Sequence, residues 1–306
     1  MIGLGGVGGY FGFKLAQSLH PDSNVNVIFV ARHSTFDHVN SHGLRLLSPE
    51  HGDSVVKPDR LLSGVEELSA IDLVWICVKE YDLEKVCEQL TEKLTDSSVI
   101  LPLMNGVDIY DRIRKIVTKG IVLPACVYVA SHIKEKGVVE HKGNPGRIIF
   151  GNDPSFPHYV PDKVIALFNR AGIVFGYRQD PFQEIWTKFL FIAPFGLVTA
   201  RYNVPIGKVH EDDDLKAQAR VIMQEVLALA HAKGISLPDD AIDRTFQKAA
   251  TFPYHTPTSL QLDIHAGKQK SELELFAGAI MNYGEQHAVP TPATRRLYEE
   301  IKSTTS

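Results

Sequence analysis

The first 130 residues alternate between short apolar runs and amphipathic stretches. Runs typical of buried strands occupy 25–32, 54–57, 71–78, 97–107 and 121–131. A helical stripe at 10–20 ends at the sequence PDSN (21–24), and a helix at 81–94 carries Leu83, Val86, Leu90 and Leu94 on one face. Strands that alternate with helices predict an α/β fold with a doubly wound parallel sheet. Segments 138–143 and 147–152 flank the sequence GNPG, which predicts a hairpin.

The pattern changes near residue 180, after which every periodic segment is helical. The predicted helices cover 182–200, 213–233, 239–250 and 275–283. Ser271 and Glu274 have the spacing of a capping box at the start of the last one. We therefore predict an N-terminal Rossmann-type domain over 1–180 and an all-helical C-terminal domain over 181–306.

A glycine-rich turn, GLGGVGGYFG, covers residues 3–12, and Gly3, Gly5 and Gly8 fit the pattern G-x-G-x-x-G. In a strand–turn–helix context such glycines let the backbone approach a pyrophosphate at a helix N-terminus. We predict that Gly3, Gly5, Gly6, Val7 and Gly8 bind a dinucleotide; the alternative is a simple small-residue turn. Only two residues precede Gly3, whereas a central strand usually has about five, so we expect missing native residues or a misassigned start.

The end of the second predicted strand bears on which dinucleotide binds. The sequence there is Val30-Ala31-Arg32-His33, without the acidic residue that accepts from the ribose of NAD. A guanidinium pairs bidentately with a phosphate, so Arg32 predicts NADP as the cofactor. The alternative is a solvated surface arginine.

The bulk composition excludes several classes of protein. The 306 residues carry a formal net charge of −4, which favours neither nucleic acid nor an anionic membrane as partner. Three cysteines without a C-x-x-C pair predict reduced thiols in a cytoplasmic protein. We predict no metal among the 13 histidines, although His38 and His42 have the i, i+4 spacing of a ligand pair. We expect a small-molecule substrate and a monomer or homodimer.

Separated motifs, in a fixed order, give the chain a resemblance to the ketopantoate reductase (2-dehydropantoate 2-reductase) family over nearly its whole length. Besides the glycine turn and the arginine in VARHS, the matching residues are Lys79 in CVKEYD, Asn105 in LPLMNGVD, Lys188 in IWTKF, Ser259 and Asp263 in PTSLQLDI, and Glu272 in KSELELFAG. The resemblance implies NADPH-dependent reduction of ketopantoate, a 2-keto acid, to pantoate in pantothenate and coenzyme A synthesis.

The resemblance also implies roles for these residues. Lys188 would be the general acid that protonates the new alkoxide, and Glu272 would hold the substrate hydroxyl. Asn105 would lie by the nicotinamide and the substrate, Ser259 would bind the substrate carboxylate, and Lys79 would lie near the cofactor.

The residues themselves give partial support. Lys188 is flanked by bulky apolar residues, which would lower its pKa toward the working range of an acid; the alternative is an ion pair with Glu184 one turn earlier. Glu225 falls on an apolar helical face and needs a partner. We predict that it serves the substrate site through Lys188, and a buried structural ion pair is the alternative. Because Glu274 fits the capping box, Glu272 is left for the substrate.

The chain departs from the family in the expected substrate pocket. Ile192 and Gly196 stand where the family usually carries asparagines, and Ile206 replaces a further one. One extra residue separates Asp263 from Glu272. Loss of hydrogen-bonding groups strongly changes substrate preference. Two alternatives therefore stay open: a reductase of another, more apolar 2-keto acid, and a non-catalytic NADP(H)-binding sensor.

Overall fold

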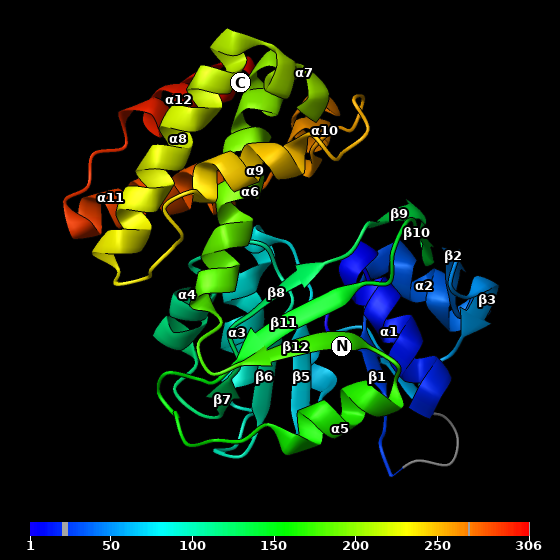
Figure 1. The fold of residues 1–306 in the computed structure, drawn as a ribbon. Helices are drawn as coiled ribbons and strands as arrows, with labels where there is room; N and C mark the ends of the chain where they lie inside the picture. Colours follow the sequence, from blue (N-terminus) through cyan, green and yellow to red (C-terminus); the bar gives the residue numbers. More distant parts are fainter. Residues whose placement is uncertain (20–23, 269, 306) are drawn as a thin grey trace. The chain divides into compact units, whose positions relative to one another are not determined.

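The structure is a computed structural model that describes residues 1–19, 24–268 and 270–305 (Figure 1). The predicted end of the first helix at 20–23 lies outside these residues. The chain divides into two compact units. The first contains Met1–Asn105 and Ile109–Pro181, and the second contains Gly106–Asp108 and Phe182–Ser306.

A parallel sheet forms the centre of the first unit, which confirms the predicted α/β fold. Its strands are β1 (Ile28–Val30), β4 (Arg60–Leu62), β5 (Leu73–Ile76), β6 (Val99–Pro102) and β7 (Ile121–Val122). Ile2 forms parallel bridges to both Val30 and Ile76, so it fills the gap between β1 and β5. The order across the sheet is therefore β4, β1, Ile2, β5, β6 and β7.

Two further sheets complete this unit, and they correct the predicted hairpin. One has the order β3 (Gly52–Val56), β2 (Leu44–Ser48), β10 (Val138–His141) and β9 (Ser131–Glu135). The other has the order β12 (Val174–Arg178), β11 (Arg147–Gly151) and β8 (Ala125–Tyr128). Since β10 and β11 lie in different sheets, the prediction that they pair across GNPG was wrong. The run predicted as one strand at 121–131 is divided among β7, β8 and the start of β9.

Helix α1 (Gly6–Leu19) packs between two of these sheets. One side contacts β2, β9 and β10, where Gly9 lies against Val139. Gly12 faces the Phe29 ring of β1, and the Phe11 ring lies 6.3 Å from that of Trp75 in β5. Burial on both sides explains why α1 is apolar around much of its circumference. The remaining helices of the unit are α2 (His33–His42), α3 (Leu83–Thr91), α4 (Ile109–Ile116) and α5 (Asp162–Arg170), and short 3₁₀ turns cover Val65–Glu67 and Glu80–Asp82.

The second unit is helical in its described residues, as predicted. Its elements are α6 (Phe182–Tyr202), α7 (Ile206–Glu211), α8 (Asp213–Ala232), α9 (Ala241–Ala249), α10 (Ser259–His265), a π-helical turn (Glu274–Gly278), α11 (Ala279–His287) and α12 (Pro292–Thr305). Helix α6 is the centre of the unit, and α7 to α10, α12 and the π-helical turn all contact it. Within the described residues, no helix is long and apolar enough to cross a membrane.

The predicted capping box at Ser271 is absent. The π-helical turn has no side-chain cap at its start. The Glu274 carboxylate instead accepts a hydrogen bond of 2.5 Å from the Tyr298 hydroxyl and lies 3.3 Å from the Lys302 ammonium. A contact with α12 has therefore replaced the local cap that the spacing suggested.

Candidate active site

The glycine turn follows Ile2 at the carboxyl end of the central position of the sheet. Gly3 has a φ of +89°, and a Cβ there would lie 2.6 Å from the carbonyl oxygen of Cys77. A Cβ on Gly8 would lie 2.0 Å from the carbonyl oxygen of Gly3. The Cβ position of Gly5 has nothing within 4 Å. Packing of the turn therefore requires Gly3 and Gly8, whereas Gly5 leaves backbone open to a ligand.

The N-terminus of α1 adds a favourable electrostatic environment. The helix begins at Gly6 and Val7, and its first turn holds no acidic residue. The first amide groups of a helix lack partners within the helix and carry a partial positive charge. A glycine turn that runs into such an N-terminus binds phosphate groups. These features fit the pyrophosphate of a dinucleotide.

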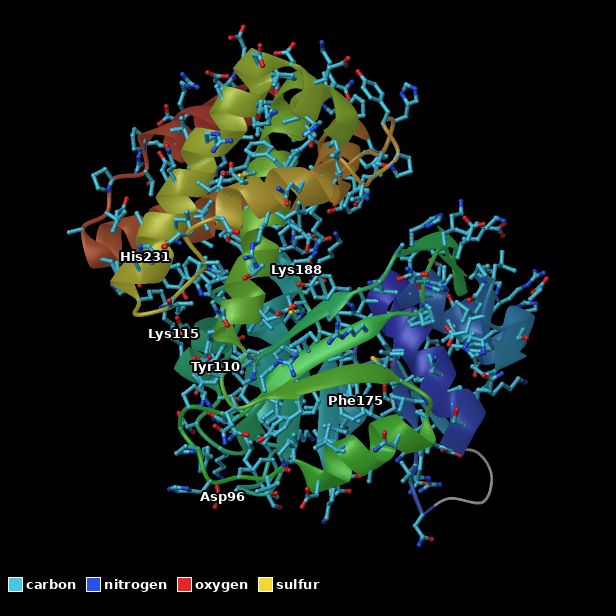
Figure 2. The ribbon with its side chains drawn as sticks, in the orientation of Figure 1. Asp96, Tyr110, Lys115, Phe175, Lys188 and His231 are labelled. Carbon is cyan, nitrogen blue, oxygen red and sulfur yellow. The ribbon has the colours of Figure 1, made fainter. Side chains whose placement is uncertain are left out.

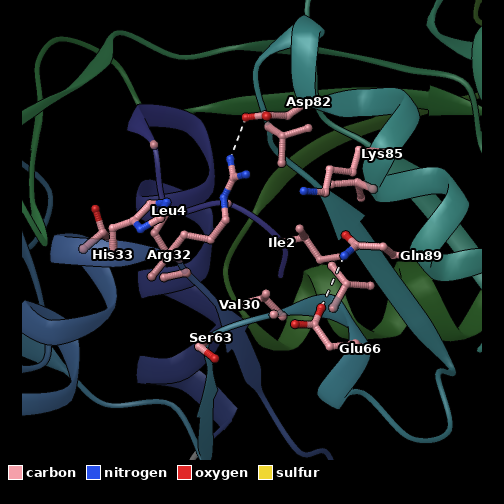
Figure 3. Close-up of a pocket in the computed structure, with 18 of the residues that line it drawn as sticks. Ile2, Leu4, Val30, Arg32, His33, Ser63, Glu66, Asp82, Lys85 and Gln89 are labelled. Carbon is pink, nitrogen blue, oxygen red and sulfur yellow. Dashed lines mark hydrogen bonds and ion pairs between the residues drawn. The ribbon is translucent and has the colours of Figure 1, made fainter.

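A cavity of about 350 Å³ adjoins the glycine turn (Figure 3). Gly3, Gly5 and Arg32 line it, among the predicted cofactor residues. The Arg32 side chain is half-exposed, and its Nη2 donates a hydrogen bond of 2.6 Å to Oδ2 of Asp82. Sequence reasoning thus found the arginine, but it did not find its partner.

Other cavity residues were also missed. Asp82, Lys85, Val86 and Gln89 line the cavity from α3 and the turn before it. Their spacing of three or four residues puts them on one side of the helix, next to the buried Leu83 and Leu90 face. The amphipathic period of 81–94 could therefore have been used to predict which residues of this helix line the cavity. Ser63 and Glu66 line the cavity from the segment after β4, where no such period exists.

Lys79 and Asn105 lie at the same edge of the parallel sheet as the glycine turn. Lys79 follows the end of β5, and Asn105 follows the end of β6, which pairs with β5 in parallel. In open α/β sheets, ligands bind beyond the carboxyl ends of the strands. Neither residue is among those that line the cavity of Figure 3. Their position at this edge fits a second part of an extended dinucleotide.

In the second unit, Lys188 projects from α6 (Figure 2). Its side chain is half-buried, and the adjacent Phe189 and Leu190 are buried. The Phe189 ring lies 6.2 Å from the Phe276 ring in the π-helical turn. Glu272, just before that turn, is 6% exposed. The segment that carries Glu272 thus packs along the part of α6 that carries Lys188.

Ser259 lies in α10, which packs against α6. It is the exposed first residue of α10, after the N-cap Thr258, whose hydroxyl lies 2.7 Å from the Thr199 hydroxyl of α6. Thr199 is 11 positions after Lys188, which corresponds to roughly 16 Å along a helix axis. Asp263, one turn into α10, is buried and forms an ion pair with Lys268.

Glu225 accepts hydrogen bonds at a helix end, and these replace the predicted partner Lys188. Its Oε1 accepts a hydrogen bond of 2.7 Å from the Ala293 amide, and its Oε2 accepts bonds of 3.0 and 2.6 Å from the amide and hydroxyl of Thr294. These donors lie at the N-terminus of α12, where helix amides need acceptors. The hydrogen bonds of the carboxylate therefore come from a helix end and not from Lys188. A role of Glu225 at the substrate stays a prediction. The apolar surroundings of Glu225 correctly indicated that its carboxylate needs a partner. The sequence suggested the cation Lys188, whereas backbone amides of Ala293 and Thr294 are the donors in the structure.

The positions that depart from the family are apolar in the structure. A Cβ on Gly196 would be in ordinary contact with Phe276 and Leu260, at 3.7 and 3.9 Å. Ile192 is half-buried, and Ile206 is buried. Within the described residues, no group of three or more histidine, cysteine or acidic side chains is placed to hold a metal ion.

A parallel-sheet unit with a glycine turn at a helix N-terminus is the architecture of a dinucleotide-binding protein. Comparison with protein families is more specific. The family model "Ketopantoate reductase PanE/ApbA" matches residues 1–155, and the model of its C-terminal part matches residues 180–305. The chain belongs to the ketopantoate reductase family.

Individual relatives are distant but cover the full length. An uncharacterized oxidoreductase of Bacillus subtilis is 23% identical, over 99% of this chain and 97% of its own length. The crystal structure of a ketopantoate reductase from Ralstonia eutropha superposes with a TM-score of 0.88 at 28% identity, covering 99% and 97% of the two chains. A D-mandelate dehydrogenase in complex with NADH and anilino(oxo)acetate superposes with a TM-score of 0.85 at 18% identity, covering 99% and 97%, and shares the fold.

Proposed function

We propose that the protein is an NADPH-dependent 2-dehydropantoate 2-reductase, which reduces the C2 carbonyl of ketopantoate to the hydroxyl of pantoate. The observation that carries the proposal is the pairing of a sterically defined glycine turn with Arg32 on one cavity. Membership of the ketopantoate reductase family supports the reaction. We retain the cytoplasm as the expected location, because the three cysteines are odd in number and buried.

The nicotinamide cofactor, when bound, supplies the hydride for C2. Gly3, Gly5, Gly6, Val7 and Gly8 would hold its pyrophosphate, and Arg32 would pair with its 2′-phosphate. Lys79 and Asn105, at the same sheet edge, would contact the nicotinamide half.

The second unit would supply the substrate and proton chemistry. Lys188 would donate its Nζ proton to the alkoxide oxygen that forms at C2, and its charge would stabilise that oxygen as negative charge develops. Glu272 would accept a hydrogen bond from a substrate hydroxyl, and Ser259 would donate one to the substrate carboxylate. Glu225 stays a prediction as a substrate residue, since its three described hydrogen bonds go to the N-terminus of α12.

The decisive experiment is the loss of NADPH absorbance when purified full-length protein meets ketopantoate. We expect turnover in the wild type, and a kcat lower by roughly 10²- to 10⁴-fold in Lys188→Ala, with NADPH binding retained. Lys216→Ala is the matched control, because Lys216 is another half-buried lysine of the second unit. NADPH binding without turnover on any 2-keto acid would contradict the proposal and indicate a sensor.

A second candidate function follows from the apolar surroundings of Gly196 and Ile192. If those positions line the substrate pocket, a 2-keto acid with a larger apolar side chain gains contacts there and needs fewer hydrogen bonds. Comparison of kcat/KM for ketopantoate, 4-methyl-2-oxopentanoate and phenylpyruvate separates the two. A higher kcat/KM for an apolar acid would identify it as the better substrate.

A further inference from the structure

Asp82 breaks a local rule at the start of α3. It occupies the N-cap position, where an aspartate normally accepts hydrogen bonds from the first helix amides. Here the side chain makes no capping bond. Its carboxylate pairs instead with Arg32, 50 positions away in the sequence. An exposed ion pair adds little stability, and Arg32 is 52% exposed. The stability of the fold therefore does not explain why Asp82 pairs with Arg32 instead of capping α3.

Lys85 brings a second cation to the same cavity. It lies three residues after Asp82, and its side chain extends from α3 into the cavity that Arg32 enters from the opposite wall (Figure 3). Within the part of the chain that the structure describes, no group forms a hydrogen bond or ion pair with its ammonium. The cavity therefore holds two cations, Arg32 and Lys85, and two carboxylates. Asp82 is the carboxylate that pairs with Arg32, whereas Glu66 accepts a hydrogen bond from Gln89.

The charges of this trio fit the two dinucleotides differently. A phosphate monoester carries about two negative charges near neutral pH, so a 2′-phosphate matches Arg32 together with Lys85. An ionised carboxylate only accepts hydrogen bonds, so Asp82 repels that phosphate but can accept from a free 2′-hydroxyl. Binding of NADPH then requires Arg32 to exchange its carboxylate partner for phosphate, whereas NADH leaves the pair in place.

We propose that Asp82 sets the balance between NADPH and NADH in this chain: it competes with the 2′-phosphate for Arg32 and accepts a hydrogen bond from the 2′-hydroxyl, while Lys85 is the second phosphate cation. The proposal rests on the proposed function, because it concerns the same dinucleotide. It assigns both cofactors to one cavity. The preference is then a matter of one carboxylate rather than of Arg32 alone.

The test is the dissociation constant of each dinucleotide, measured by calorimetry on the full-length protein without substrate. In Asp82→Asn we expect NADPH to bind about tenfold more tightly, because one repulsive charge near the phosphate is gone. We expect NADH to bind several-fold more weakly. Lys85→Ala should weaken NADPH about tenfold and leave NADH unchanged. Adenosine 2′,5′-bisphosphate and 5′-AMP should show the same two trends without the nicotinamide half.

Glu88→Gln is the matched control, because Glu88 is exposed on α3 and lies outside the cavity lining. It removes the same charge from the same helix, and we expect both dissociation constants to stay within about twofold of the wild type. If Asp82→Asn changes the NADPH-to-NADH ratio by less than about threefold, or no more than Glu88→Gln does, the inference is overturned. Wild-type protein that binds neither dinucleotide would overturn the proposed function itself.

Discussion

The structural position of Glu225 leads to a quantitative prediction for stability. The 7% exposed carboxylate accepts three hydrogen bonds from Ala293 and Thr294 at the N-terminus of α12. In Glu225→Ala the two amides and the hydroxyl lose their acceptor inside the unit, and a small cavity remains. Each hydrogen bond to a charged group contributes about 1.5–3 kcal/mol, but bonds that share one carboxylate are not additive. We expect the free energy of unfolding of the second unit to fall by roughly 3 kcal/mol.

Glu225→Gln divides this loss into parts. The amide keeps one acceptor oxygen but removes the second acceptor and the negative charge at the positive end of α12. We expect a loss of about 1–1.5 kcal/mol. Glu299→Gln is the control, because Glu299 is an exposed carboxylate on the same helix. A surface change of this kind usually alters stability by less than about 0.5 kcal/mol.

Urea unfolding followed by tryptophan fluorescence measures these differences. The chain has two tryptophans, Trp75 in the first unit and the fully buried Trp186 in α6. A Trp75→Phe background therefore leaves Trp186 as the reporter of the second unit. With an m-value of about 2 kcal/mol per molar urea, Glu225→Ala should lower the midpoint by about 1.5 M.

Two outcomes would refute the reasoning about Glu225. One is a midpoint for Glu225→Ala that differs from that of Glu299→Gln by less than about 0.5 M, because the three bonds would then contribute almost nothing. The other is a Glu225→Gln variant of unchanged stability whose KM for ketopantoate rises strongly. That result would return the carboxylate to the substrate site, as the sequence first suggested.

Three further predictions concern the first unit. Gly8→Ala should lower the melting temperature and weaken NADPH binding at least tenfold, because its Cβ would lie 2.0 Å from a carbonyl oxygen. Gly5→Ala should weaken NADPH binding but leave the melting temperature unchanged, so equal melting temperatures of the two variants would contradict this prediction. Burial disfavours the charge on Glu50, but hydrogen bonds from Lys14 and Tyr10 outweigh burial and lower the pKa of Glu50. The ionised carboxylate therefore stabilises the folded protein above the usual carboxyl pKa, and this contribution is lost as pH falls through the lowered pKa. Glu50→Gln should therefore lose less stability than the wild type between about pH 6 and pH 3 in urea titrations, and parallel curves would argue against this. Burial raises the pKa of the Cys87 thiol to about 12, so a thiol reagent at about pH 8 should label it only in denaturant; rapid labelling of native protein would disagree.

The extent to which the sequence predicted this fold depends on how far apart the interacting residues lie. The runs at 71–78 and 97–107 are continuously apolar because β5 and β6 are covered on both faces, so their pattern is sufficient. The hairpin at 138–152 failed for the opposite reason. The GNPG turn favoured a local pairing, yet Val138–Glu140 pair with Arg45–Leu47, more than 90 positions away. No local signal encodes such a partner.

The same limit applies to the candidate site. The glycine turn could be predicted because its constraint is steric and acts within a few residues, apart from the contact of Gly3 with Cys77. The place of Arg32 at the cavity could be predicted from its position after a strand, whereas its role toward a cofactor stays a prediction. Its partner Asp82 and the role of Glu225 at α12 could not, because each arises only when distant elements pack. The structure therefore changes the interpretation most for charged residues whose partners lie far away in the sequence.

The glycine turn and the Arg32–Asp82 pair are constrained to different degrees by the fold. A side chain at Gly3 or Gly8 would collide with backbone atoms, so the fold itself maintains the glycine turn. The Arg32–Asp82 pair is partly exposed, and such a pair contributes at most about 1 kcal/mol to stability. Asp82 and Lys85 can therefore change without loss of the fold, and we expect the choice between NADH and NADPH to vary independently of the turn that we propose binds their shared pyrophosphate. A family with one turn and more than one cofactor preference is what this separation of constraints predicts.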